Sequence, residues 1–138
     1  MKEQVVTHEQ SLALKEFMFI GKCIFLYDTK GVLYSDIKTE IDLIQGGIPY
    51  NTMSYKGSAA PFKQQVFEWF IEKHDLFGKT QPYISDVEPF NLVWEFVILD
   101  LNWGEDKDIH LNTRCSFSSP KEAESACIDK LIEICKIK

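Results

Sequence analysis

The chain has little arginine and fewer basic than acidic side chains. Its 138 residues include 15 basic and 21 acidic ones, which gives a formal net charge of −6 at pH 7. Arg114 is the only arginine. Affinity for duplex DNA or RNA comes largely from Lys and Arg side chains that neutralise phosphates, so the composition argues against nucleic acid as a partner. Neutral or basic partners are favoured.

The sequence also lacks a long hydrophobic run and a cysteine framework. Its first residues, MKEQVVTHEQ, contain no apolar segment of signal-peptide length, and no stretch approaches the roughly 18 apolar residues that a membrane helix requires. The four cysteines form no CxxC pair and lie within apolar patterns, which is typical of reduced thiols in a core. We therefore expect a cytoplasmic protein that does not contact a membrane.

Motifs that hold a metal, a cofactor or a nucleophile are missing as well. The three histidines show neither HxxxH nor HExxH spacing, and no cysteine lies at a ligand spacing from them. Gly46 and Gly47 belong to neither a GxGxxG nor a GxxxxGK phosphate-binding loop. The acidic residues Glu105, Asp106 and Asp108 lack the spacing of an EF-hand loop. The sequence thus predicts no catalytic, cofactor-binding or metal-binding residue, no cofactor, and a protein that is not an enzyme.

Three segments do have the pattern of amphipathic helices. The first covers about residues 8–18 and starts with a capping box formed by Thr7 and Gln10. The second, over about residues 61–74, starts with a proline, which suits the first turn of a helix. The third begins after Ser119, which is placed to cap it. Each helix has an apolar side that must be buried against other parts of the fold.

Strand patterns lie between these helices. CIFLY and VLY, joined by the turn DTKG, predict a β-hairpin. Residues 82–85 predict a short strand, NLVWEFVILDLN from Asn91 predicts a long one, and alternating residues predict another over 109–117. The strand from Asn91 is apolar on both faces and is interrupted by Glu95. Such a strand is expected at the centre of a sheet that is covered on both sides.

These patterns predict an α+β fold in which amphipathic helices pack on a mostly antiparallel sheet, in the approximate order α-β-β-(α)-α-β-β-β-α. The length suits one domain over residues 1–138. Residues 36–60 are predicted to form an irregular insertion. Its first part has both the helical spacing Ile37, Ile41, Ile44 and the strand-like alternation Ile41, Leu43, and both readings stay open. Its second part is rich in Gly, Pro and Ser, which predicts a surface loop.

The second helix has more apolar surface than a helix on a globular surface needs. Its apolar residues spread over an arc of roughly 200°, about twice the usual width. Either two elements of the fold cover this helix or part of the arc meets a second chain. Because Trp and Tyr are favoured anchors in protein interfaces, the aromatic surplus predicts either side chains that seal the edge of a small core or an interaction surface. The residues of the predicted interaction surface are Trp69, Phe70, Trp103, Tyr50 and Tyr55.

Three segments resemble a protein family: LALKEFMFIGKCIFLY from Leu12, APFKQQVFEWFIEKHDL from Ala60 and EAESACIDKLIEICK from Glu122. The family consists of small uncharacterised proteins of phages, prophages and other mobile elements of gut anaerobic bacteria. This sequence departs from the family pattern in the segment before Ala60, and at Glu68 and Ile71, where relatives commonly carry basic residues. The resemblance implies an accessory protein of a mobile element that acts inside a bacterial cell. It implies no activity and no catalytic residue.

Together these features predict a non-enzymatic protein-interaction module with an unidentified protein partner, and a homodimer is one form that this binding can take. An alternative is a nucleic-acid-associated accessory protein that uses the solvent-facing side of the strand over 109–117, at His110, Asn112 and Arg114. A less favoured alternative is a small enzyme whose site is assembled from residues far apart in the sequence.

Overall fold

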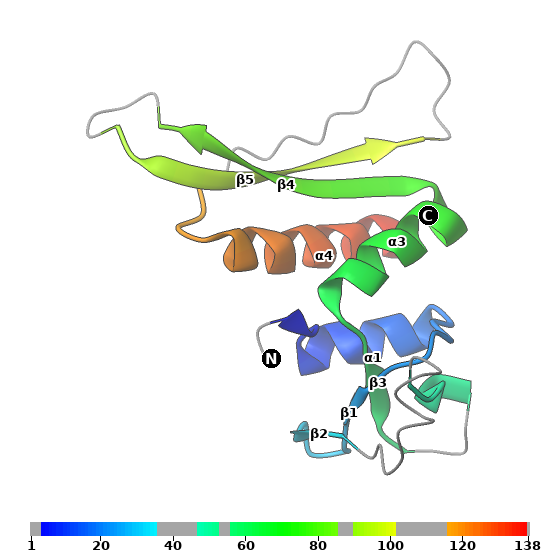
Figure 1. Ribbon diagram of the computed structural model, residues 1–138. Helices are drawn as coiled ribbons and strands as arrows, with labels where there is room; N and C mark the ends of the chain where they lie inside the picture. The colour runs from blue at the N-terminus through cyan, green and yellow to red at the C-terminus, as the bar shows by residue number, and fades with distance from the viewer. Residues whose placement is uncertain (1–3, 36–46, 53–55, 86–89, 102–115, 138) are drawn as a thin grey trace. The chain divides into compact units, whose positions relative to one another are not determined.

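The computed structural model describes residues 4–35, 47–52, 56–85, 90–101 and 116–137. Over these residues the chain has the predicted α+β fold, with α-helices and two antiparallel sheets (Figure 1). It forms two compact units, residues 1–65 and residues 66–138. In chain order the elements are α1 (His8–Glu16), β1 (Phe25–Tyr27), β2 (Leu33–Tyr34), the 3₁₀ helix η2 (Tyr50–Thr52), β3 (Ser58–Ala60), α3 (Lys63–His74), β4 (Leu76–Ile84), β5 (Leu92–Asp100) and α4 (Pro120–Ile137).

The first unit contains a three-stranded antiparallel sheet with the strand order β2-β1-β3. β1 pairs with β2 through Leu26↔Tyr34 and Tyr27↔Leu33, which confirms the predicted hairpin. α1 packs against β3. The core of this unit therefore lies between one helix and one small sheet.

β3 corrects the prediction of a surface loop before the second helix. Ser58, Ala59 and Ala60 are all buried, and they pair with the three residues of β1. The hydroxyl of Ser11 in α1 donates to Ala59 O at 2.7 Å and is also in contact with Ser58 Oγ. Small residues in β3 let the helix come this close, so a segment with the composition of a loop forms a buried strand of the sheet.

α1 begins as predicted and ends earlier than predicted. Gln10 N–H donates to Thr7 Oγ1 at 3.2 Å, and Thr7 N–H donates to Gln10 Oε1 at 3.0 Å, so the capping box is present. Met18, predicted on the buried side of the helix, lies beyond its end and is 74% exposed, with a φ of 66°. It occupies the left-handed position that closes a helix, and Phe19 N–H donates to Leu14 O at 2.9 Å across this turn.

The second unit contains the antiparallel pair of β4 and β5, whose register continues over all nine residues of each strand. β5 matches the long strand predicted from Asn91. β4 is longer than the strand predicted over residues 82–85. It begins earlier, because α3 ends at His74 and Asp75, with a φ of 53°, turns the chain directly into the strand.

α4 packs on β4 and β5, and Gly78 allows its close approach to β4 (Figure 1). A Cβ atom on Gly78 would lie 2.9 Å from Cys127 Sγ and 3.0 Å from Leu131 Cδ1. The helix begins after Ser119, as predicted, and Ser119 Oγ accepts a hydrogen bond from Glu122 N–H at 3.3 Å. One face of the β4–β5 pair is thus covered by a helix over part of its length.

α3 is buried around most of its circumference. On its wide apolar arc Ile71 is half-buried, and the other four apolar residues are at most 9% exposed: Val66, Phe67, Trp69 and Phe70. Its exposed residues form a polar stripe: Gln64, Glu68, Glu72 and Lys73. Burial within the chain accounts for these four residues, so they are not exposed to a second chain.

Some predictions lie outside the described residues, in whole or in part. Residues 36–46, 53–55 and 102–115 are not described, so the ambiguous part of the predicted insertion and most of the strand over 109–117 stay untested. At the end of that strand, Phe117 forms an antiparallel bridge with Trp94 of β5. The prediction of a single domain requires the two units to unfold together, and it stays a prediction. Among the helices of the described ranges, none combines the length and the hydropathy needed to span a bilayer.

Candidate interaction surface

The aromatic residues predicted as interface anchors are buried where the structure describes them. Trp69, Phe70 and Tyr50 are 9%, 0% and 4% exposed. The indole ring of Trp69 packs edge-on against Phe70, with ring centroids 5.0 Å apart, and against His74 at 4.8 Å. The prediction that these three side chains lie at the surface is therefore wrong. The other members of the two predicted surfaces lie outside the described residues: Trp103, Tyr55, His110, Asn112 and Arg114.

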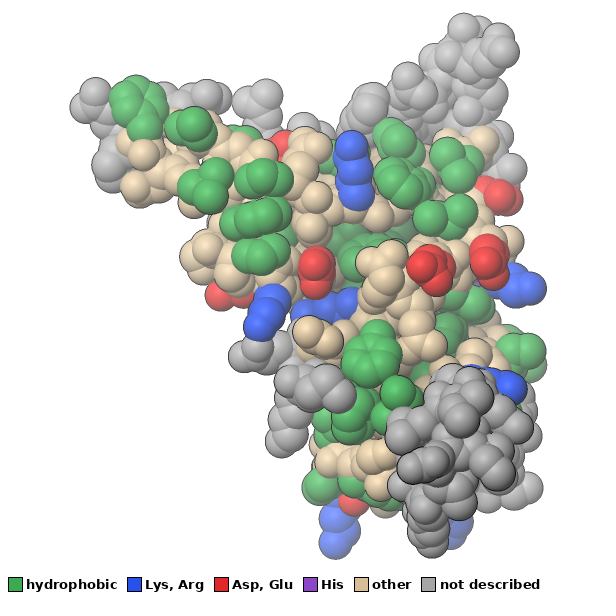
Figure 2. Space-filling model, in the orientation of Figure 1, with side chains coloured by type: hydrophobic (Ala, Val, Ile, Leu, Met, Phe, Trp, Pro, Cys, Tyr) green, Lys and Arg blue, Asp and Glu red, His purple; other side chains and the backbone are tan. Residues whose placement is uncertain are grey.

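Large apolar side chains are exposed instead at the end of the β4–β5 hairpin. Ile84 is 66% exposed, Phe90 64% and Leu92 63%. Ile84 and Leu92 face each other directly across the two strands, and Phe90 lies two residues before Leu92 in the sequence. Figure 2 shows hydrophobic side chains gathered at this end of the hairpin. We call these three residues the hairpin-end cluster.

Two members of the cluster, Ile84 and Leu92, continue the sheet face on which α4 packs. Side chains on a strand alternate between its two faces, so Leu92 shares a face with Trp94, Phe96 and Ile98. Exposure rises steadily along this face, from 1% at Ile98 and 4% at Phe96 to a half-buried Trp94 and then to Leu92. Toward the hairpin end, Phe117 is the last of the described residues that cover this face. Its ring centroid lies 6.1 Å from that of Phe96, and its backbone forms the antiparallel bridge with Trp94. Over the part of the chain that the structure describes, the apolar face therefore extends past its cover.

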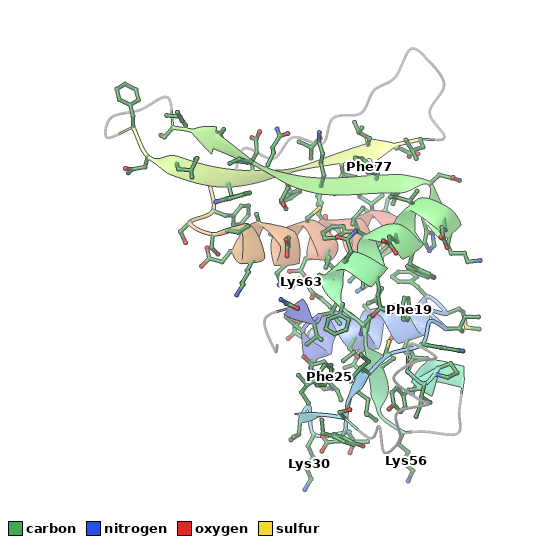
Figure 3. All side chains as sticks on the ribbon, in the orientation of Figure 1. Phe19, Phe25, Lys30, Lys56, Lys63 and Phe77 are labelled. Carbon is green, nitrogen blue, oxygen red and sulfur yellow. The ribbon has the colours of Figure 1, made fainter. Side chains whose placement is uncertain are left out.

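The opposite face of the same strands carries both polar and apolar side chains, the apolar ones being Phe77, Val93, Val97 and Leu99. Gln81 Nε2 donates to Glu95 Oε1 at 2.7 Å across the strand pair, and Glu95 is buried. The hydroxyls of Tyr83 and Ser116 are 2.8 Å apart. Phe77 projects from β4 on the side away from α4 (Figure 3). Of the exposed large apolar side chains at the hairpin end, Ile84 and Leu92 therefore share the face on which α4 packs.

The outer edge of β4 is poorly suited to pairing with another strand. Ser85 N–H donates to Asn91 O at 2.9 Å and Leu101 N–H donates to Asp75 O at 2.8 Å, so odd-numbered residues of β4 bond to β5. Even-numbered residues direct their backbone groups to the outer edge. Pro82 is one of them, and it has no N–H to donate. A proline on an exposed edge is a common protection against strand addition.

The described residues offer little support for chemistry at a thiol or a metal. Burial raises the pKa of both Cys23 and Cys127 to about 12. Because the thiolate is the reactive form of cysteine, these two free thiols are inert core residues, as predicted. Over the ranges that the structure covers, no three His, Cys, Asp or Glu side chains come together at metal-binding distance.

A comparison of the chain with protein-family models, curated proteins and solved structures found no match. The resemblance to mobile-element proteins therefore stays a prediction. The analysis of residue patterns missed Ile84, Phe90 and Leu92 as surface residues. The alternation of side chains along a strand shows which face Ile84 and Leu92 share, but it does not show where the cover of that face ends.

Proposed function

We propose that this protein is a non-enzymatic interaction module and that the hairpin-end cluster is its contact with a protein partner. The observation that carries the proposal is the exposure of three large apolar side chains, each by more than 60%, on one end of a regular strand pair. Exposed apolar side chains that occur singly need no explanation, whereas a contiguous group marks an interaction site.

The setting of the cluster suits binding. Ile84 and Leu92 belong to strands with a continuous register, so their positions are held by the backbone ladder. A rigid scaffold lowers the entropy that a contact costs on binding.

The biological setting follows from the resemblance described above. We infer an accessory protein of a phage or another mobile element that acts in the cytoplasm of a bacterial cell. Such a protein would act by contact with a protein of the host or of the element. The low arginine content and the net charge of −6 support a protein partner over nucleic acid.

The proposal is tested by affinity capture from a lysate of the native host, with and without nuclease, followed by mass spectrometry. The bait is compared with the double variant Ile84→Ser/Leu92→Ser and with the control Val32→Ser, which changes a residue that is also exposed but lies in the first unit. We expect a protein that survives nuclease, is retained by the control and is lost with the double variant.

The captured protein is then purified and titrated against the wild type and both variants. Direct binding that weakens at least about tenfold for the double variant alone, equivalent to about 1.4 kcal/mol, supports the proposal. Equal binding to all three proteins refutes the role of the cluster. Partners that disappear with nuclease would favour the nucleic-acid alternative.

A further inference from the structure

We propose that the segment bound by the hairpin-end cluster is a single amphipathic helix with a net positive charge, which packs on the same sheet face as α4. This inference rests on the proposed function and specifies the chemistry of the partner. Four properties of the second unit support this inference: the sheet face that Ile84 and Leu92 share with α4, the outer edge of β4 that Pro82 interrupts, the exposed apolar area, and the net charge.

The shared face favours a helix. α4 already packs on this face, at Gly78, and the apolar side chains of β5 continue past it from Trp94 to Leu92. A sheet face that accepts the apolar stripe of one helix presents the same spacing of side chains to another. A helix from a partner would therefore repeat, beyond Trp94, the packing that the chain makes with its own helix.

The strand edge disfavours an extended peptide. Strand addition takes its affinity from main-chain hydrogen bonds. Pro82 lies among the even-numbered residues that face the outer edge of β4, between Thr80 and Ile84, and it supplies no donor there. A strand added along this edge would lose a hydrogen bond beside the cluster, whereas a helix on the face needs none.

The exposed area disfavours a second copy of the chain as the occupant. The three side chains leave on the order of 300 Å² open, if full burial of a Phe covers about 200 Å² and that of an Ile or Leu about 100 Å². A stable interface between two proteins buries about 800 Å² on each. An area of this size matches one face of a short helix better than a self-contained dimer.

The charge favours a basic helix. Residues 66–138 contain eight basic and fourteen acidic side chains, so the whole net charge of the protein belongs to this unit. Exposed acidic residues of the described part include Glu122, Asp129 and Glu133 of α4. Complementary charge raises the association rate and penalises partners of the wrong sign, so Lys and Arg are expected on the polar side of the bound helix.

The test is selection from a displayed library of random peptides of about 16 residues, long enough to form a helix when bound. The full-length protein is the target, and the double variant Ile84→Ser/Leu92→Ser is used for counter-selection. We expect enriched peptides with apolar residues at positions i, i+3, i+4 and i+7 and with a net positive charge. A synthetic peptide of the enriched sequence should gain helical circular dichroism on binding and should bind at least about tenfold more weakly to the double variant.

Three results would overturn the inference. These are enriched peptides with strict apolar alternation, no enrichment over the double variant, or light scattering that shows a dimer of the wild type which Leu92→Ser abolishes. If the host protein binds through the cluster but the peptides are not helical and basic, the inference fails and the proposed function stands. If neither a host protein nor a peptide binds the wild type more tightly than the double variant, both the inference and the proposed function fail. Because both substituted residues are exposed, the variants should fold, and circular dichroism confirms this.

Discussion

Among the described residues, the strands within 1–65 have two or three residues each, whereas those within 66–138 have nine each. Short strands supply few ladder hydrogen bonds, and in the first unit polar side chains add others to the backbone. Ser11 donates to Ala59 O at 2.7 Å, Tyr27 Oη donates to Val6 O at 2.6 Å, and Asn51 Nδ2 donates to Phe19 O at 2.9 Å. Specific polar contacts thus take the place of regular pairing.

The second unit depends more on apolar packing. α4 places fully buried side chains against β4 and β5: Ala123, Cys127, Ile128 and Leu131. The units also differ in charge. Residues 1–65 contain seven basic and seven acidic side chains, whereas residues 66–138 contain eight basic and fourteen acidic ones. We therefore expect the first unit to be sensitive to the loss of single hydrogen bonds and the second unit to be sensitive to the loss of buried volume.

The largest effect is expected for Leu131→Ala. Removing this buried side chain from α4 should lower the free energy of unfolding by about 2 to 5 kcal/mol, because the transfer energy and a cavity term add. Ile137→Ala, in the same helix at an exposed position, should change it by less than about 0.5 kcal/mol. Urea titration followed by circular dichroism measures both variants.

The same titration also tests whether the two units unfold together. All three tryptophans lie in residues 66–138, so tryptophan fluorescence reports on the second unit alone, whereas circular dichroism reports on both. If the chain is one domain, the two signals change together in Leu131→Ala and in the wild type. Separate transitions would show that the units are independent domains.

Gly78→Ala should destabilise the second unit by about 1 to 3 kcal/mol, because the new methyl group meets Cys127 Sγ and Leu131 Cδ1 in a filled core. Cys127→Ala removes one of these obstacles. The double variant should therefore be more stable than the sum of the two single changes predicts. Strictly additive free energies of unfolding would contradict the close approach of α4 to β4.

Ser11→Ala tests the polar contacts of the first unit. The change removes the hydroxyl that donates to Ala59 O and touches Ser58 Oγ, and it should cost roughly 1 to 2 kcal/mol because buried polar groups lose a partner. Adding Ser58→Ala should cost less than the two single changes together. Thermal unfolding of the three variants measures this coupling, with Leu12→Ala as the exposed control in the same helix.

The smallest effect, and the one of opposite sign, is expected for Met18→Gly. A left-handed backbone conformation costs an L-amino acid roughly 1 to 2 kcal/mol. Glycine avoids this cost but loses more conformational entropy on folding, so the net gain is only part of it. The substitution should stabilise the protein by about 0.5 to 1 kcal/mol. Met18→Ala keeps the unfavourable φ of 66° and should bring no such gain in melting temperature.

Local patterns predicted the helices well. Thr7 and Gln10 marked the start of α1, and the apolar spacing up to His74 marked the end of α3. Capping and periodicity act over a few residues, so they are visible in the sequence. The end of α1 was predicted less well, because Met18 takes a conformation that glycine usually provides.

The strands were predicted where they are rich in β-branched and aromatic residues, as in β5, and missed where they are not. β3 consists of Ser58, Ala59 and Ala60, which have low strand propensity, and its place next to β1 comes from contacts far apart in the sequence. β4 contains Gly78 and Pro82, which argue against a strand in isolation. Pairing with β5 and packing against α4 override these preferences.

By itself, the sequence determined the α+β class, the positions of the helices, the long strand β5 and the burial of Cys23 and Cys127. All of these follow from the apolar period and from local hydrogen bonding. Only the tertiary structure decided that Trp69, Phe70 and Tyr50 are core residues and that Ile84, Phe90 and Leu92 are exposed. The physical reason is that periodicity identifies the apolar side of an element, while exposure depends on which distant segment covers that side and on where its cover ends.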